Sequence, residues 1–518
     1  MAIFETVLDH LTLRNVFLAI AGYVIYSTIY QIVYYRFFHP LSAFPGPFWA
    51  TVTRIWLGYH NYMQTELAAC YEAHKKYGPV IRITPTMLLV SDARKLPEVY
   101  HFKADKSPYY LTGSFGETES LFNIRDHKTH AKLRKLIAPP YSFSKVSTME
   151  PMMDERLEAW IQKLDETFAS TGKDFDFCEW AVFMAYDIVS DFGFGAPFGF
   201  VESGTDIGGL IQGFHDGMTA FGLLGRFYPF TGLLKKTSIG KQALVAKPED
   251  NTGIGTLMRF RDKLLAQRLA DIEAGKTPRL DLLQTFLEAR TAEGKPLDEE
   301  YIKAEILLVL LAGADTTGTA FQAVLYYLFT HPECYKKMMI EIDNATRKGL
   351  LSKIPQYAEV QQHCPYYNAV IKESMRLCPS APNIFPRMVS EGGIELFGKY
   401  APAGVEITCN PWFVGRDKSL YGEDAEVFRP ERWIEDPKEK VKEYDKYSMV
   451  FGYGARVCLG KDVALMEMAK GPLLFFQKFE PQLVDPSKTG EFIVHGGVGF
   501  WERINITIKR RKAVKREV

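Results

Sequence analysis

The sequence predicts a mostly α-helical (α+β) fold with small β-sheets, preceded by one transmembrane helix. Three observations predict this class. Apolar residues recur at every third or fourth position over long stretches after residue 127, strand-like runs are few and short, and residues 16–35 carry no charged side chain. No low-complexity block or Ser/Gly linker divides the 518 residues, so we expect the rest of the chain to form one large domain.

The first predicted element is the span over residues 16–35, VFLAIAGYVIYSTIYQIVYY. About 20 apolar residues cross the hydrocarbon core of a bilayer. A cleaved signal peptide and a buried core helix are the alternatives. The first usually has a basic start, a shorter apolar region and a small-residue cleavage site, and the second is usually apolar along one stripe only. A transmembrane anchor is therefore the favoured interpretation.

A proline-rich connector follows the span, because Pro40, Pro45 and Pro47 around Gly46 cannot continue a helix. Basic residues gather at the far end of the chain, where a solvated tail is the expected state and contact with anionic lipid the alternative. The predicted divisions are residues 1–15 as a short N-terminal segment, 16–35 as the anchor, 36–50 as a hinge, 51–509 as the large domain and 510–518 as a basic tail.

The large domain begins with a predicted β-hairpin, in which residues 80–83 and 87–90 flank Thr84-Pro85-Thr86. Short strands are also predicted near 394–409 and 501–509. Apolar periodicity predicts the helices between them. They run roughly over 127–138, 150–168, 178–193, 255–273, 297–330 and 364–378.

Composition excludes several classes of function. The formal net charge is zero, so the chain has no basic field of the kind that binds nucleic acid. The seven cysteines are scattered and contain no Cys-x-x-Cys pair, which favours a reducing compartment and disfavours structural zinc. His-Glu-x-x-His, Gly-x-Ser-x-Gly and Gly-x-x-x-x-Gly-Lys motifs are also missing. Aromatic residues make up 14% of the chain, enough to line an apolar pocket.

Residues 451–460, FGYGARVCLG, place Cys458 at the mouth of a glycine-rich loop, just before a helix predicted to run to about Lys470. A helix N-terminus, a nearby cation and a bound metal each lower the pKa of a thiol, and Arg456 is the nearby cation expected here. Glycines let the backbone approach a flat group closely, and N–H groups after Cys458 can then point at the sulfur. This geometry suits axial ligation of haem iron. For the other six cysteines, burial as small hydrophobes is the expected state.

A second motif, residues 312–318 (AGADTTG), interrupts the most apolar helix. The hydroxyl of Thr316 can bond the carbonyl of Ala312 four residues back, beside Gly313, so we expect a local opening of the helix. Asp315 and Thr316 could then pass protons to dioxygen bound nearby. A threonine that merely bonds its own helix turn is the alternative.

A third motif, Glu373-Ser374-Met375-Arg376, puts a carboxylate and a guanidinium on one helical face. An ordinary surface ion pair is the alternative reading of that spacing.

Together the three motifs resemble the cytochrome P-450 family of haem-thiolate monooxygenases, over essentially the whole chain. They match Phe-x-x-Gly-x-Arg-x-Cys-x-Gly, Ala/Gly-Gly-x-Asp/Glu-Thr and Glu-x-x-Arg, and residues 428–433 match the later segment that completes the Glu-x-x-Arg network. The resemblance implies a P-450 fold with haem b ligated by Cys458. It implies oxygen activation by Asp315 and Thr316, and a structural network of Glu373, Arg376 and Arg432. The residues implied to contact the haem besides Cys458 are Phe451, Gly452, Ala312 and Gly313.

Planar arginines are the expected partners of the two haem propionates. Arg456 is the strongest candidate. Arg134 stands where the family has Trp-x-x-x-Arg, with His130 in the place of the tryptophan, and Arg387 follows the Glu-x-x-Arg helix. A surface position is the alternative for Arg134 and Arg387.

The resemblance further implies a monooxygenase that hydroxylates or otherwise oxidises an apolar small molecule, with electrons from NADPH. These electrons would arrive through NADPH-cytochrome P-450 reductase and, in some members, cytochrome b5, because no dinucleotide-binding loop is present. Membrane-bound eukaryotic members sit in the endoplasmic reticulum by a single span with the catalytic domain cytosolic. Residues 35–41 and 192–200 are similar to filamentous-fungal members, the group that includes pisatin demethylase. Such enzymes tailor secondary metabolites of terpenoid, polyketide or alkaloid type.

Two other functions stay open at this stage. A haem-thiolate isomerase or dehydratase would turn over without NADPH, and such enzymes often lack the acid-alcohol pair of Asp315 and Thr316. A haem-binding sensor or carrier would have no need of that pair.

The substrate-lining segments implied by the family are residues 108–122, 198–234, 309–316, 380–385 and 496–501.

Overall fold

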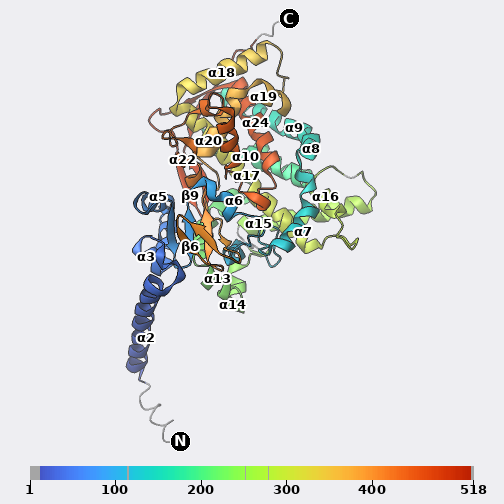
Figure 1. Cartoon of the computed structure of the whole chain (residues 1–518). Coiled ribbons are helices and arrows are strands. Elements are labelled where there is room, and N and C mark those ends of the chain that lie inside the picture. The colour runs from blue at the N-terminus through green and yellow to red at the C-terminus, as the bar shows by residue number, and fades with distance from the viewer. Residues whose placement is uncertain (1–11, 114–115, 251–252, 278, 515–518) are drawn as a thin grey trace, which may run out of the picture.

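The computed structural model describes residues 12–113, 116–250, 253–277 and 279–514. An N-terminal helix, α2 (Leu13–Val33), projects from the helical body and continues through a π-helical turn, Tyr34–Phe38 (Figure 1). In the part of the chain that is described, two helices are long and apolar enough to cross a membrane. The segment Arg14–Phe38 has none of its apolar window buried, whereas Glu299–Thr330 is 67% buried. The first therefore fits the predicted anchor and the second belongs to the core.

The proline-rich connector after the anchor is packed onto the body. It contains a 3₁₀ turn, Pro40–Ala43, with Leu41 and Phe44 buried. The carbonyl of Pro45 accepts a hydrogen bond from the backbone N–H of Arg82 at 2.8 Å. A Cβ atom added to Gly46 would lie 2.3 Å from the carbonyl oxygen of Arg82, so only glycine fits there. The anchor thus leaves the body from a fixed place beside the first strand.

Four small sheets are present among the described residues. The predicted hairpin forms from β1 (Val80–Thr84) and β2 (Met87–Val90), and it joins a four-stranded sheet of order β1-β2-β7-β4. Strand β7 runs parallel to β2, and β4 runs antiparallel to β7. A three-stranded sheet has the order β3-β11-β8, and two hairpins pair β5 with β6 and β9 with β10. The remaining strands are β3 (Phe175–Asp176), β4 (Arg387–Met388), β5 (Ile394–Leu396), β6 (Lys399–Ala401), β7 (Glu406–Cys409), β8 (Phe479–Leu483), β9 (Glu491–His495), β10 (Val498–Glu502) and β11 (Asn505–Arg510).

Helices make up most of the body, and each of the six predicted helical stretches has a helix in it. The helices after α2 are α3 (Phe48–Val52), α4 (Ile55–Tyr62), α5 (Glu66–Tyr77), α6 (Leu96–Val99), α7 (His127–Ile137), α8 (Phe143–Val146), α9 (Glu150–Leu164), α10 (Phe177–Phe194), α11 (Phe200–Ser203), α12 (Leu210–Arg226), α13 (Tyr228–Leu234), α14 (Ser238–Leu244), α15 (Gly253–Glu273), α16 (Leu282–Glu288), α17 (Glu299–Thr330), α18 (Pro332–Arg347), α19 (Tyr357–His363), α20 (Pro365–Leu377), α21 (Pro411–Val414), α22 (Lys418–Tyr421), α23 (Lys438–Lys446) and α24 (Lys461–Lys478).

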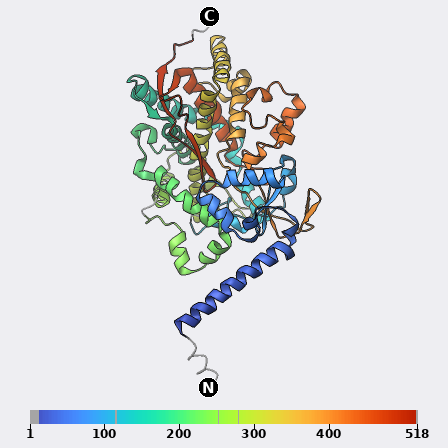
Figure 2. The ribbon, with the colours of Figure 1, turned by 90° about the vertical axis from the view of Figure 1, so that its left-hand side faces the viewer.

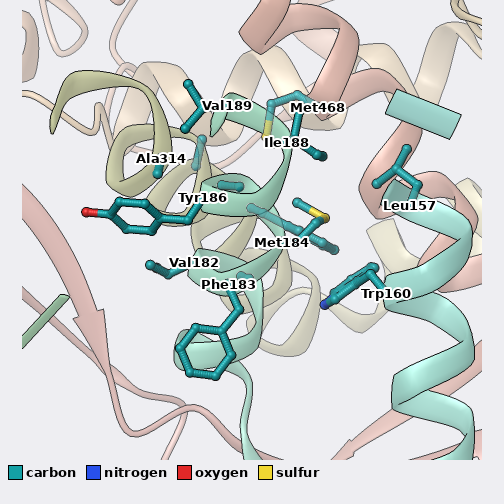
Figure 3. Close-up of a cluster of buried hydrophobic side chains, with 14 of the residues drawn as sticks. Leu157, Trp160, Val182, Phe183, Met184, Tyr186, Ile188, Val189, Ala314 and Met468 are labelled. Atoms are coloured by element: carbon teal, nitrogen blue, oxygen red, sulfur yellow. The ribbon is translucent and has the colours of Figure 1, made fainter. Parts of the chain in front are cut away.

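The longest helix, α17, lies at the centre and packs along α10. Two glycines of α17 make this close approach possible. A Cβ atom on Gly313 would lie 2.6 Å from a methyl group of Val189, and one on Gly318 would lie 2.8 Å from a methyl group of Val182. On its other side α10 packs against α9, where Figure 3 shows Met184 close to Trp160. The middle of α17 is therefore held firmly from the α10 side.

The helix after Cys458 differs from its predicted extent. We predicted an end near Lys470, but α24 continues to Lys478 with Pro472 inside it. Proline removes a helical hydrogen bond and costs about 3 kcal/mol in a helix interior. Leu473, Phe475 and Phe476 after it are fully buried, and burying each contributes roughly 1.5–3 kcal/mol. Tertiary packing therefore outweighs the local penalty and keeps the helix intact.

Helix α2 and the end of strand β11 lie at opposite ends of the molecule (Figure 2). Helix α2 leaves from one end, and helices α13 and α14 lie at that same end in both views (Figures 1 and 2). These helices expose Phe230, Leu233 and Ile239. At the other end β11 leads into the C-terminal residues, where Arg510 pairs with Asp165 and Arg511 with Asp343.

Candidate functional site

The loop before α24 places Cys458 by backbone contacts. The N–H of Cys458 donates to the carbonyl of Phe451 at 2.8 Å, which closes the loop. Gly452 has a φ of 76° and Gly454 a φ of 68°. A Cβ atom on Gly454 would also lie 2.4 Å from the carbonyl oxygen of Tyr100. Larger residues would be strained at both glycines, so the glycine-rich pattern fixes the shape of the loop.

Cys458 is the accessible cysteine of the seven, and the other six are buried. The protein atoms that surround the thiol desolvate it and raise its pKa, whereas the N–H groups of Gly460 and Lys461 and the charges of Arg134 and Lys461 lower it. The N–H groups therefore point at the sulfur, as the sequence suggested. The nearby cations, however, are Arg134 and Lys461 and not the expected Arg456. Because burial dominates, a stable thiolate needs a further positive charge, and a bound metal ion supplies one.

Helix α17 packs against α24, the helix that follows the Cys458 loop. Ala312 is exposed although Leu310, Leu311 and Ala314 beside it are buried. An accessible thiol and an accessible strip of alanine and glycine in the interior suit a flat, apolar group between them.

The hydroxyl of Thr316 donates to the carbonyl of Ala312 at 2.9 Å, as the sequence predicts. The expected local opening of the helix is wrong for this structure, because α17 is α-helical throughout Glu299–Thr330. Close packing of Gly313 and Gly318 on α10 holds the turn that Thr316 alone would weaken.

Asp315 is 1% exposed and turns away from Thr316 to other helices. The hydroxyl of Tyr186, on α10, donates to its Oδ2 at 2.9 Å, and Nε2 of His215, on α12, lies 2.7 Å from its Oδ1. Sequence reasoning missed Tyr186 and His215. Tyr186 lies 129 positions and His215 lies 100 positions before Asp315, so no local sequence pattern links them to it.

Four cations gather where the loop, α7 and β4 meet. Arg134 donates to the carbonyl of Val457 at 2.8 Å, and Arg387 donates to the hydroxyl of Tyr110 at 2.8 Å. Arg456 donates to two backbone carbonyls, of residues 124 and 125, at 2.7 and 2.6 Å. The fourth cation, Lys106, is 5% exposed and donates to the carbonyl of residue 122. Within the described ranges, none of the four forms a salt bridge with a carboxylate.

These cations repel one another. Burial and the charges of Arg387, Arg456 and Arg134 hold the pKa of Lys106 well below its ordinary value, and they outweigh the attraction of Glu305. Burial and Arg387 lower the pKa of Arg456 to about 10. Buried charges are unfavourable without a counter-charge. The two propionates of haem, each able to accept bidentate hydrogen bonds, fit this cluster. Lys106 is thus a candidate ligand-binding residue that the sequence motifs did not reveal.

His130, which stands in the place of the family's tryptophan, is 4% exposed beside the same cluster. Burial and the charges of Arg456 and Lys106 lower its pKa to about 3, so its ring is neutral. A neutral imidazole keeps one N–H donor, as an indole does.

Glu373, Arg376 and Arg432 form a fully buried network. Nε and Nη2 of Arg376 donate to the two oxygens of Glu373 at 2.8 and 2.7 Å, and Nε of Arg432 donates to Oε1 at 2.9 Å. The N–H of Arg429 and Nε1 of Trp433 complete five hydrogen bonds to this carboxylate. Burial opposes ionisation, but Arg376 and Arg432 hold the pKa of Glu373 below its ordinary value. The alternative interpretation, a surface ion pair between Glu373 and Arg376, is therefore wrong.

The five segments expected to line a substrate pocket meet in space. Asn383 accepts a hydrogen bond from the hydroxyl of Tyr109 at 3.3 Å and from Arg226 at 3.1 Å. Its amide donates to the carbonyl of Gly496 at 3.3 Å. Ser380 donates to the carbonyl of Thr316 at 2.6 Å. The structure thus brings together segments from residue 109 to residue 496 around the middle of α17.

Comparisons with known proteins agree with this site. The family model described as Cytochrome P450 matches residues 34–498. Quiannulatic acid synthase of Emericella variicolor is 40% identical over 470 residues, which cover 89% of this chain and 91% of that protein. Cytochrome P450 monooxygenase gsfF of Penicillium aethiopicum is 34% identical, with 91% and 93% covered. Cytochrome P450 monooxygenase pkfB of Emericella nidulans is 31% identical, with 90% of each covered.

Proposed function

The chain belongs to the cytochrome P450 family, and from that premise we propose that Cys458 is the residue through which it holds haem b. As a member of this family it is a haem-thiolate monooxygenase that receives NADPH-derived electrons from a reductase. The observation that carries the proposal is the thiol of Cys458, accessible in a loop whose N–H groups point at the sulfur. When bound, the haem supplies the iron at which dioxygen is activated.

The remaining residues of the haem site have separate tasks. Lys106, Arg134, Arg387 and Arg456 would bind the propionates. Phe451, Gly452, Ala312 and Gly313 would pack against the ring, where small side chains and backbone leave room for it. This assignment is supported by the unpaired cation cluster and by the accessible strip on α17.

Asp315 and Thr316 would hold and pass the protons that reduction of dioxygen consumes. Glu373, Arg376 and Arg432 would act structurally, since their network ties α20 to the segment that precedes the Cys458 loop.

The substrate is an apolar small molecule, and we propose a secondary metabolite of terpenoid, polyketide or alkaloid type. The five converging segments are rich in Phe, Leu, Gly and Tyr, which favours such a ligand over a sugar or a nucleotide. One relative is named as the synthase of an acid and two as monooxygenases. These names favour oxidation over the isomerase or dehydratase alternative.

The exposed, apolar helix α2 supports a membrane anchor. We propose a single-pass location in the endoplasmic reticulum membrane, with residues 1–15 lumenal, 16–35 in the bilayer, 36–50 as the connector, and the catalytic domain over 51–509 and the tail over 510–518 cytosolic. Exposed apolar residues of α13 and α14 lie at the same end as α2, where a membrane surface would meet them. NADPH-cytochrome P450 reductase, and cytochrome b5 where it takes part, would dock on the side of the Cys458 loop.

The testing experiment is the carbon monoxide difference spectrum of the reduced, membrane-expressed protein. The wild-type protein should show a thiolate-type Soret band, and Cys458→Ser should lose it. Cys334→Ser is the matched control, because the thiol of Cys334 already lies beside the carboxylate of Glu333 and a hydroxyl can donate there. No haem in the wild type, or a thiolate band that survives in Cys458→Ser, would refute the assignment.

A further inference from the structure

Three buried or half-buried side chains form a hydrogen-bonded cluster at the middle of α17. Tyr186 and His215 both bond the carboxylate of Asp315, one to each oxygen. Asp315 is almost fully buried, whereas 31% of the side chain of His215 is exposed. His215 is therefore the more accessible member of this pair and Asp315 the buried one.

Tyr186 is not a second route for protons to Asp315. Its ring is fully buried, and Figure 3 shows its hydroxyl on the side of Ala314, away from Leu157 and Trp160. Burial and Asp315 raise the pKa of the Tyr186 hydroxyl well above its ordinary value, so it stays a donor. Of the two side chains bonded to Asp315, His215 alone is of a type that exchanges protons near neutral pH.

The surroundings of His215 decide when it carries a proton. Burial lowers its pKa, but the hydrogen bond and charge of Asp315, on α17, raise it above 6.5 in the balance. Asp206, which precedes α12, and Asp216, on α12 itself, act in the same direction. His495, on β9, is the titratable group nearby with the opposite effect, and the ring of Phe500, on β10, lies 4.3 Å from the imidazole. His215 thus stays protonated at a higher pH than an ordinary histidine.

We propose that His215 is a positioning and proton-supplying residue that acts through Asp315. The inference rests on the proposed function, in which Asp315 and Thr316 handle the protons that dioxygen reduction consumes. The imidazolium of His215 passes its Nε2 proton to Oδ1 of Asp315 and becomes neutral. The carboxyl group of Asp315 then holds that proton, and His215 takes a new proton from water that reaches its accessible edge. The hydrogen bond from Tyr186 keeps the carboxylate oriented toward His215.

A purely structural role is the competing explanation, in which the pair only fastens α12 over α17. His215→Asn separates the two. Asparagine keeps a side-chain N–H donor that can reach a carboxylate, but it cannot exchange a proton in this pH range. A structural role would be preserved by this variant, and proton supply would not. His363→Asn makes the same chemical change on α19, far from the site along the chain, and serves as the matched control.

The first test measures the protonation of His215 without turnover of the enzyme. Diethyl pyrocarbonate reacts with neutral imidazole, so its rate of reaction at His215, followed by peptide mass spectrometry over a pH series, gives the protonation midpoint. We expect a midpoint above that of an ordinary histidine, about 6.5, and a fall in Asp315→Asn. A wild-type midpoint at or below the ordinary value, or one unchanged in Asp315→Asn, overturns the proposal. This readout is independent of the haem assignment, which the carbon monoxide spectrum tests separately.

The second test uses the holoenzyme with reductase, NADPH and dioxygen as the only substrates. Wild-type dioxygen consumption should fall as the pH rises through the His215 midpoint. His215→Asn should be slower by about 10-fold or more at neutral pH, the low end of what proton transfer contributes, and should lose this pH dependence. A variant with an intact carbon monoxide spectrum that keeps the wild-type rate and pH profile overturns the proposal. If His215→Asn does not fold, the pH dependence of wild-type dioxygen consumption decides the question, because a purely structural pair would not make the rate follow the His215 midpoint.

Discussion

Replacing Glu373 by glutamine should strongly destabilise the protein, because its carboxylate accepts five hydrogen bonds in a fully buried place. Glutamine keeps the shape of the side chain but turns one acceptor oxygen into an NH₂ donor. If that group replaces Oε2, Arg376 and Trp433 each lose one hydrogen bond, and if it replaces Oε1, Arg376, Arg432 and the Arg429 N–H lose theirs.

At least two donors therefore lose their partner. A hydrogen bond to a charged group contributes about 1.5–3 kcal/mol. Two of them give roughly 3–6 kcal/mol, in line with about 3–5 kcal/mol for breaking a buried ion pair. Because the pKa of Glu373 is lowered in the folded state, its contribution is present above its ordinary pKa of 4.5 and is lost as the pH falls through the folded value. The difference in the free energy of unfolding between wild type and Glu373→Gln should therefore become smaller at acid pH.

The assay is urea unfolding of the full-length protein in detergent, followed by tryptophan fluorescence and by loss of the thiolate-type carbon monoxide band. Glu300→Gln is the control, since Glu300 forms an exposed pair with Lys303 that contributes about 0–1 kcal/mol. Glu373→Gln should lower the urea midpoint clearly and Glu300→Gln should leave it nearly unchanged. Equal midpoints for the two variants would refute the reasoning.

Three further perturbations address the cation cluster, the Cys458 loop and α24. Lys106→Met removes one charged partner of the propionates and should weaken haem binding by roughly 10- to 100-fold. The measurement is the rate of haem transfer to apomyoglobin, which should be faster for this variant. Lys103 is exposed, so a transfer rate equal to that of Lys103→Met would contradict the prediction. Gly454→Ala should lose much of the thiolate-type band, because Gly454 has a φ of 68° and its Cβ atom would lie 2.4 Å from a carbonyl oxygen. Gly404→Ala is the control and should keep the band, because Gly404 has a φ of 84° but lies in open space. Equal spectra for the two variants would show that the close approach does not matter. Burial raises the pKa of Glu467 from its ordinary 4.5 to about 8, so its contribution is full below pH 4.5 and is lost as the pH rises to about 8. The free energy of unfolding of the wild type should therefore decline by up to about 1.4 kcal/mol per pH unit as the pH rises, and Glu467→Gln should remove this decline. The urea midpoint of the variant should then rise above that of the wild type with increasing pH. Midpoints that stay parallel over the pH series would count against the prediction.

Features that depend on residues close together in the chain could be predicted from the sequence. The glycine-rich loop could be predicted around Cys458 because backbone conformation at Gly452 and Gly454 is a local property. The uncharged span predicted α2, and apolar periodicity predicted the main helices, since both patterns repeat within one element. The bond from Thr316 to Ala312 followed from their spacing of four residues.

The residues that these elements bring together depend on how the elements pack in three dimensions. Lys106 joined the arginines, and Tyr186 and His215 joined Asp315, across separations that no local pattern records. The structure also placed Arg134 and Lys461, and not Arg456, as the cations that lower the pKa of the thiol, kept α17 closed at Thr316 and continued α24 through Pro472. In each case packing between elements outweighed a local preference. The physical reason is that burial and charge act through space, so their balance is set when the helices meet.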